Sequence, residues 1–168
     1  MQLPIVDPLD LERMSPAFRT FYHSYFIDKI LVLRNELDDK WVDGLSPDEL
    51  DLARRLVRAN LANGQIYREA AALLNDRDAI PLLHAMLEGT RDLSEKIYIA
   101  LPLWYLEQAP VYPALIDKLV HSKQSELKKR HLWEILAIGD MRAIDHLFTL
   151  AEDADESVRE LAIFHLTA

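Results

Sequence analysis

The sequence has no cysteine and only 4 glycines among its 168 residues. The absence of cysteine excludes disulfide bonds, thiolate zinc sites and cysteine nucleophiles. So few glycines leave no phosphate-binding loop, and the P-loop, G-x-G-x-x-G and G-x-S-x-G motifs are all absent. A composition poor in glycine and rich in alanine, leucine, glutamate and arginine favours helix over sheet.

Long apolar runs are also absent. No stretch reaches the roughly 18 apolar residues that a membrane span needs. The start, MQLPIVDPLDLERM, lacks the basic region and apolar core of a secretory signal. We therefore expect a cytoplasmic protein with no membrane partner, folded as a single domain over residues 1–168.

Positive charge is scarce, because the formal net charge is −9. Such a charge repels nucleic acid and anionic lipid. It favours a basic partner, but an acidic balance is also the usual state of cytosolic proteins, and we prefer this second interpretation. One basic segment opposes this trend, and it consists of Lys118, Lys123, Lys128, Lys129 and Arg130. Five cations are few for a nucleic-acid site, so we predict no nucleic-acid binding and interpret the segment as a solvated face or an anchor for an acidic partner.

Residue patterns that carry chemistry are missing as well. The 6 histidines form neither H-E-x-x-H nor H-x-E, the signatures of zinc hydrolases and deaminases. His131 takes a position that small residues occupy elsewhere in an internal repeat, which indicates a core histidine rather than a ligand. We predict no catalytic residues, no metal site and no cofactor.

The strongest positive signal is that internal repeat. A shift of about 32 positions aligns the first helix of each unit, and a slightly shorter shift aligns the second. The aligned positions include Ala79, Val111 and Ala143; Leu83, Leu115 and Leu147; and Ala100, His131 and Ala162. A period of this length is typical of stacked helical units that cannot bury their apolar faces alone.

The last unit carries two motifs, IGDMRAI at Ile138–Ile144 and DESVR at Asp155–Arg159. Gly139 suits a tight turn between helices, and Asp140 can cap the next helix. These motifs resemble the short bacterial HEAT-like repeats of the phycobilisome-lyase kind. The resemblance implies a solenoid that binds other proteins, and it implies no reaction. Some HEAT-repeat hydroxylases bind iron through repeated His-Glu pairs, but this sequence has no His-Glu dipeptide.

The predicted fold is all-α: a right-handed α-solenoid of HEAT-like helix pairs over 76–168, with a helical N-terminal cap over 1–75. We expect an extended arm over 1–14, whose first half contains Pro4 and Pro8. The cap helices are expected at 15–37, 46–61 and 65–74. The repeat pairs are expected at 79–87 with 94–107, 111–120 with 127–138, and 141–151 with 156–166.

Local patterns mark the first two cap helices. Ser15 followed by proline is a helix start, and Ser46 with Glu49 forms a capping box. The first helix carries an aromatic-rich stripe at helical spacing, which we interpret as core packing.

A helical wheel places Trp133 on the outward face of its helix, among charged residues. The step that aligns the second helices leads from Trp133 to Pro102 and Phe164. The predicted partner-binding strip on the concave face comprises Tyr98, Pro102, Tyr105, Lys129, Arg130, Trp133 and Phe164. The alternative is that the N-terminal helices fold over these residues.

The sequence thus predicts a non-enzymatic protein–protein interaction module, such as a bacterial adaptor or a toxin-neutralising immunity protein. The alternative is a lyase-type or chaperone-type enzyme subunit, or a nucleic-acid-processing HEAT fold. The C-terminal helix is apolar to Leu166, whereas a solenoid needs a polar cap on its last unit. Another chain can cover such an end, so homo-oligomerisation through this helix is a further expectation.

Overall fold

The computed structural model of the chain describes residues 7–33 and 39–167. All regular elements within these ranges are helices, and none is a strand, which confirms the all-α prediction. Among the same residues, no helix combines the length and apolarity required to cross a bilayer. The chain divides into two compact units, Met1–Met86 and Leu87–Ala168.

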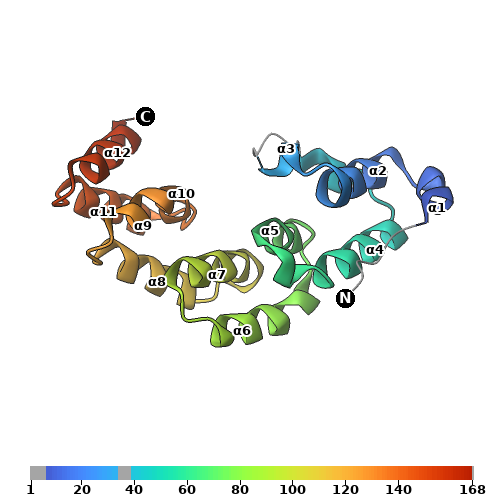
Figure 1. Cartoon of the computed structure of the whole chain (residues 1–168), viewed down its shortest axis with the longest axis horizontal. Coiled ribbons are helices and arrows are strands. Elements are labelled where there is room, and N and C mark those ends of the chain that lie inside the picture. The colour runs from blue at the N-terminus through green and yellow to red at the C-terminus, as the bar shows by residue number, and fades with distance from the viewer. Residues whose placement is uncertain (1–6, 34–38, 168) are drawn as a thin grey trace. The chain divides into compact units, whose positions relative to one another are not determined.

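The first unit consists of short helices (Figure 1). They are α1 (Pro8–Arg13), α2 (Pro16–Tyr22), the π-helix η1 (His23–Ile27), α3 (Ile30–Leu33), the 3-10 helix η2 (Asp39–Gly44), α4 (Pro47–Arg58), the 3-10 helix η3 (Leu61–Asn63), α5 (Gln65–Leu73), the 3-10 helix η4 (Arg77–Ala79) and most of α6 (Ile80–Gly89).

Two expectations for this unit are wrong. The predicted extended arm contains α1, because Asp7 caps the helix by accepting a hydrogen bond from the Leu9 N–H at 2.8 Å and Pro8 occupies its first turn. The long helix predicted over 15–37 is interrupted at Asp28, whose backbone is extended. The last part of that prediction, 34–38, lies outside the described residues.

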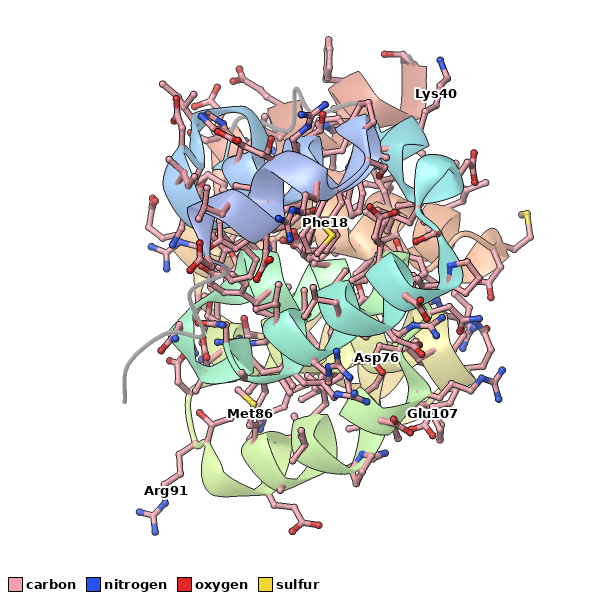
Figure 2. The ribbon with its side chains drawn as sticks, turned by 90° about the vertical axis from the view of Figure 1, so that its right-hand side faces the viewer. Phe18, Lys40, Asp76, Met86, Arg91 and Glu107 are labelled. Atoms are coloured by element: carbon pink, nitrogen blue, oxygen red, sulfur yellow. The ribbon has the colours of Figure 1, made fainter. Side chains whose placement is uncertain are left out.

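The core of the first unit is aromatic, as the helical spacing of its first residues predicted. Phe18, Phe21 and Tyr25 are buried together with Trp41, and the rings of Phe21 and Trp41 stack at 5.0 Å between centroids. Phe18 lies between the ribbons of α2 and α4, which contact each other (Figure 2).

The predicted capping box at the start of α4 is confirmed. Ser46 Oγ accepts the Glu49 N–H, and Glu49 Oε2 accepts the Ser46 N–H at 2.9 Å. The same carboxylate also reaches another helix, because its Oε1 accepts the Ser15 N–H at 2.6 Å. Glu49 therefore joins the N-terminal ends of α2 and α4.

The second unit follows the predicted helix pattern closely. It contains α7 (Leu93–Glu107), α8 (Val111–Val120), α9 (Ser125–Arg130), α10 (Leu132–Leu136), α11 (Met141–Ala151) and α12 (Glu156–Thr167). α7 packs on α8, α8 contacts both α9 and α11, and α12 packs on α11 and α9 (Figure 1). One buried cluster that includes Tyr112, Ile116, Ile135 and Leu147 joins these helices.

The single helix predicted over 127–138 is split at His131. This residue has φ −103° and ψ 23°, and it separates α9 from α10. His131 is completely buried, and one of its ring nitrogens, Nε2, lies 2.5 Å from Ser94 Oγ. The equivalent repeat positions hold alanine, so a bulkier imidazole occupies the place of a methyl group at the point where the helix is interrupted.

The turn before α11 has the geometry predicted from IGDMRAI. Gly139 has φ +74°, a conformation that glycine adopts without strain. Asp140 caps α11, because its Oδ1 accepts the Arg142 N–H at 2.9 Å.

Candidate protein-binding surface

Two exposed aromatic side chains of the second unit are joined through a histidine. Trp133 on α10 is 70% exposed, and Phe164 on α12 is 63% exposed. The His165 ring contacts both, at 4.9 Å from Trp133 and 5.3 Å from Phe164 between centroids. Leu161 lies one helical turn before His165 and is 38% exposed. We call Trp133, Leu161, Phe164 and His165 the Trp133 surface.

The helical repeat of α12 explains why these residues share one side. Val158 and Ala162 are buried. Leu161 and His165 are four residues apart, so they lie on one flank of α12, and Phe164 extends that flank toward solvent. The flank faces Trp133, as the ring contact with His165 shows.

The basic residues of α9 differ in how available they are. Lys128 is buried, and its Nζ lies 2.5 Å from Asp153 Oδ2 on the link before α12. Lys129 pairs with Glu126, and this hydrogen bond raises the pKa of Lys129. Arg130 is exposed and forms no ion pair with any described residue. Of the basic residues of α9, only Arg130, three positions before Trp133, is exposed without an ion pair to a described residue.

The remaining residues of the predicted strip, all on α7, do not form a continuous surface with Trp133. Tyr105 is 56% exposed. Tyr98 is half-buried, and its ring packs on His131 at 4.6 Å between centroids. Pro102 is buried, so its predicted exposure is wrong. The reason is that α7 is apolar nearly all round, and the repeat alignment does not show which side the neighbouring helices cover.

Sequence analysis missed a buried polar cluster beneath this region. His131 Nε2 contacts Ser94 Oγ, while His131 Nδ1 lies 3.6 Å from Glu134 Oε2. These last two atoms have no hydrogen-bond partner among the described residues. Serine, histidine and carboxylate follow one another as in a hydrolase triad. However, Ser94 is only 8% exposed and His131 is fully buried, so a substrate has no access to the hydroxyl. We interpret the cluster as structural.

An arginine-lined pocket of about 440 Å³ lies in the first unit, formed by Asp51, Arg54, Arg55, Arg58, Asn75, Asp76, Arg77 and Asp78. Arg54 donates two hydrogen bonds to the Leu74 carbonyl, at 3.0 and 2.9 Å. Arg58 contacts Asp76 at 3.1 Å and Asp78 at 2.5 Å, and Figure 2 shows Asp76 beside guanidinium groups. Burial raises the pKa of Asp76, while Arg58 opposes the rise. The alternating charges tie α4 to the turn after α5.

Metal chemistry finds no support in the part of the chain that the structure describes. No group of three or more histidine, aspartate or glutamate side chains there could hold a metal ion. The prediction that the protein needs no metal stays a prediction.

We expect no DNA complex at physiological salt. Lys128 is buried against Asp153, and Lys129 is paired with Glu126, so two of the five basic residues are already neutralised. Affinity for DNA depends on several phosphate contacts and falls steeply with salt. A gel shift with micromolar protein in about 150 mM salt tests this, and a discrete complex would contradict it.

Comparison with known proteins gives no match: no family model, curated protein or solved structure is similar to this chain. The resemblance of the last unit to HEAT-like repeats therefore stays a prediction. The functional argument depends on the surfaces and clusters described above.

Proposed function

We propose that the protein is a non-enzymatic interaction module that binds another protein through the Trp133 surface. The observation that carries this proposal is the exposure of Trp133 and Phe164, 70% and 63%, on either side of His165. Tryptophan and other aromatic residues are enriched at interfaces, and tryptophan is among the commonest binding hot spots. Arg130 adds a charge that a partner carboxylate can pair with.

Within this proposal, the helices of the second unit are HEAT-like pairs of a right-handed solenoid. The repeat alignment, the Gly139 turn and the Asp140 cap support it. A cytoplasmic adaptor or a toxin-neutralising immunity protein fits such a module. The net charge of −9 favours a partner that is basic overall.

Replacing Trp133 by alanine tests whether this side chain is free for a partner. An exposed side chain contributes little to folding, so we expect the free energy of unfolding to fall by less than about 1 kcal/mol. A core tryptophan would cost about 3–5 kcal/mol. Urea denaturation followed by circular dichroism separates the two values, and a loss in the upper range would exclude Trp133 as an interface residue.

The binding role itself needs a partner, which a photo-crosslinking residue at position 161 can capture and identify while Trp133 stays in place, because Leu161 is 38% exposed on the same surface. Trp133→Ala and Phe164→Ala should each weaken that complex by about 2 kcal/mol or more, as central aromatic anchors do. Phe148→Ala is the matched control, since Phe148 is 60% exposed on another helix, α11. Isothermal titration that shows equal losses for Phe164→Ala and Phe148→Ala would refute the proposed surface.

A further inference from the structure

A second apolar surface lies on α11. Met141, Ile144 and Phe148 are 67%, 40% and 60% exposed. Their spacing of three and four residues places them along one side of the helix. The opposite side of α11 faces α8, because the two helices contact each other. His146 on that side interacts electrostatically with Asp117 of α8 and with His121, which caps the C-terminal end of α8. The exposed stripe therefore points away from the rest of the helical stack.

α12 contributes Ile163 to the same side. This residue is 49% exposed and lies on the flank of α12 opposite His165, which contacts Trp133 of α10. Because α11 and α12 pack along each other, the flanks that turn away from α8 and α10 lie together. We call Met141, Ile144, Phe148 and Ile163 the end face.

The end face has an acidic rim. Asp145 on α11 and Glu152 at the C-terminal end of α11 lie within about one turn of Phe148. Glu156 lies on the Ile163 flank of α12, and Glu160 lies between that flank and Phe164. All four are exposed, and none forms an ion pair with a described residue.

The nearest described cations of these helices, Arg142 and Arg159, form no ion pair with the rim carboxylates. Arg142 pairs with Asp140 at 2.6 Å and lies over the Trp104 ring. Arg159 donates to the carbonyls of Asp153 and Ala154, at 2.8 and 3.0 Å. Hydrogen bonds to carbonyls leave the charge of Arg159 in place four residues before Ile163, so the rim has four carboxylates against one guanidinium and stays net negative.

We propose that the end face is a second docking surface whose occupant is an amphipathic helix of another protein, with lysine or arginine flanking its apolar stripe. The exposed apolar stripe can pack against the apolar face of an amphipathic helix, and the acidic rim is complementary to basic flanks. A second copy is disfavoured, because a twofold contact would bring the same four carboxylates together. This proposal is independent of the Trp133 surface.

Two designed peptides test the proposal with the full chain. One is an amphipathic leucine–lysine helix, made longer than the marginal length of isolated helices. The other has glutamate at each lysine position. Methyl NMR spectra of isoleucine and methionine in about 150 mM salt, where long-range charge effects are screened, locate binding. The leucine–lysine peptide should shift the methyl signals of Met141, Ile144 and Ile163, and the leucine–glutamate peptide should shift none of them.

Matched variants separate this site from general attraction between a basic peptide and an acidic protein. Phe148→Ser and the double variant Glu152→Lys/Glu156→Lys should each weaken peptide binding at least tenfold in fluorescence anisotropy. Phe164→Ser and the double variant Asp39→Lys/Asp43→Lys should leave it within twofold. Phe164 belongs to the Trp133 surface, and Asp39 and Asp43 belong to the first unit, where the double variant makes the same change in net charge. All the altered side chains are exposed, and circular dichroism verifies that each variant is folded.

Several results would overturn the proposal. They are unchanged binding in Phe148→Ser, equal binding of the leucine–glutamate peptide, and methyl shifts outside the end face. Concentration-dependent shifts of the same methyl groups without peptide would instead show that a second copy covers this face.

Discussion

Replacing Lys128 by methionine should lower the free energy of unfolding by about 3–5 kcal/mol, the usual cost of breaking a buried ion pair. Lys128 Nζ lies 2.5 Å from Asp153 Oδ2, and the two side chains are only 6% and 11% exposed. Without the ammonium group, Asp153 must stay charged in a nearly dry site or take up a proton. Protonating an aspartate of ordinary pKa at pH 7 costs about 4 kcal/mol. Because Asp153 can take this route, the loss of stability cannot greatly exceed that value.

Two further variants make this test specific. In Lys128→Met/Asp153→Leu the unpaired charge is gone, so most of the lost stability should return. Lys129→Met removes an exposed pair with Glu126 and should cost less than about 1 kcal/mol. Urea unfolding at pH 7 measures all three. A loss below about 1 kcal/mol for Lys128→Met would contradict the buried pair.

Glu49→Gln should be the most damaging conservative change in the first unit, at about 2–3 kcal/mol. Its carboxylate accepts backbone hydrogen bonds from Ser15 and Ser46 at 2.6 and 2.9 Å. Glutamine keeps the shape, but it has one acceptor oxygen and loses the charge that makes such bonds worth about 1.5–3 kcal/mol. One N–H group at a helix start then faces the amide nitrogen, another donor.

The same carboxylate should make stability depend on pH. Burial opposes its ionisation, but the hydrogen bonds from Ser15 and Ser46 prevail, so the pKa of Glu49 is lowered in the folded state. Its contribution is complete above the unfolded glutamate pKa of about 4.3 and is lost as pH falls through the lower folded value.

Urea midpoints at pH 7 and at about pH 3.5, below the ordinary glutamate pKa, therefore measure this contribution. The Glu49→Gln variant should lose less stability on acidification than the parent chain. Asp48→Asn is the matched control, because Asp48 is the exposed neighbour in the same first turn of α4. An equal loss in Glu49→Gln and the parent would contradict the assignment.

Local signals predicted much of the fold. α8 and α11 begin and end at the predicted residues, because apolar spacing and turn residues define short helices well. The capping box at Ser46 follows from four adjacent residues. The contact of Glu49 with Ser15 does not, since it joins residues 34 positions apart and no local pattern encodes it. The start of α1 was overlooked, although Asp7-Pro8 is the same kind of helix start as Ser15-Pro16, a capping residue followed by proline.

The candidate site was also predicted only in part, because local patterns do not encode contacts between residues that are far apart in the sequence. A wheel gives the direction of a side chain on its own helix, and the exposure of Trp133 agrees with that direction. Phe164, which the repeat step placed on the same strip, is exposed as well. It does not show what neighbouring helices cover, so Pro102 was misplaced. Lys128 was grouped with solvated bases, because its partner Asp153 lies 25 residues later. The Ser94–His131–Glu134 cluster had only one signal, a histidine at a small-residue position.

The interruption at His131 has a consequence for local unfolding. α9 and α10 contain 6 and 5 residues, whereas isolated helices shorter than about 12–15 residues are marginal in water. Their backbone order therefore depends on side chains such as Lys128 and His131 staying docked on neighbouring helices. Amide protons across this segment should exchange with solvent by a partial opening, well before the rest of the unit unfolds. Trp133 lies on this segment, so a bound partner should slow exchange there most.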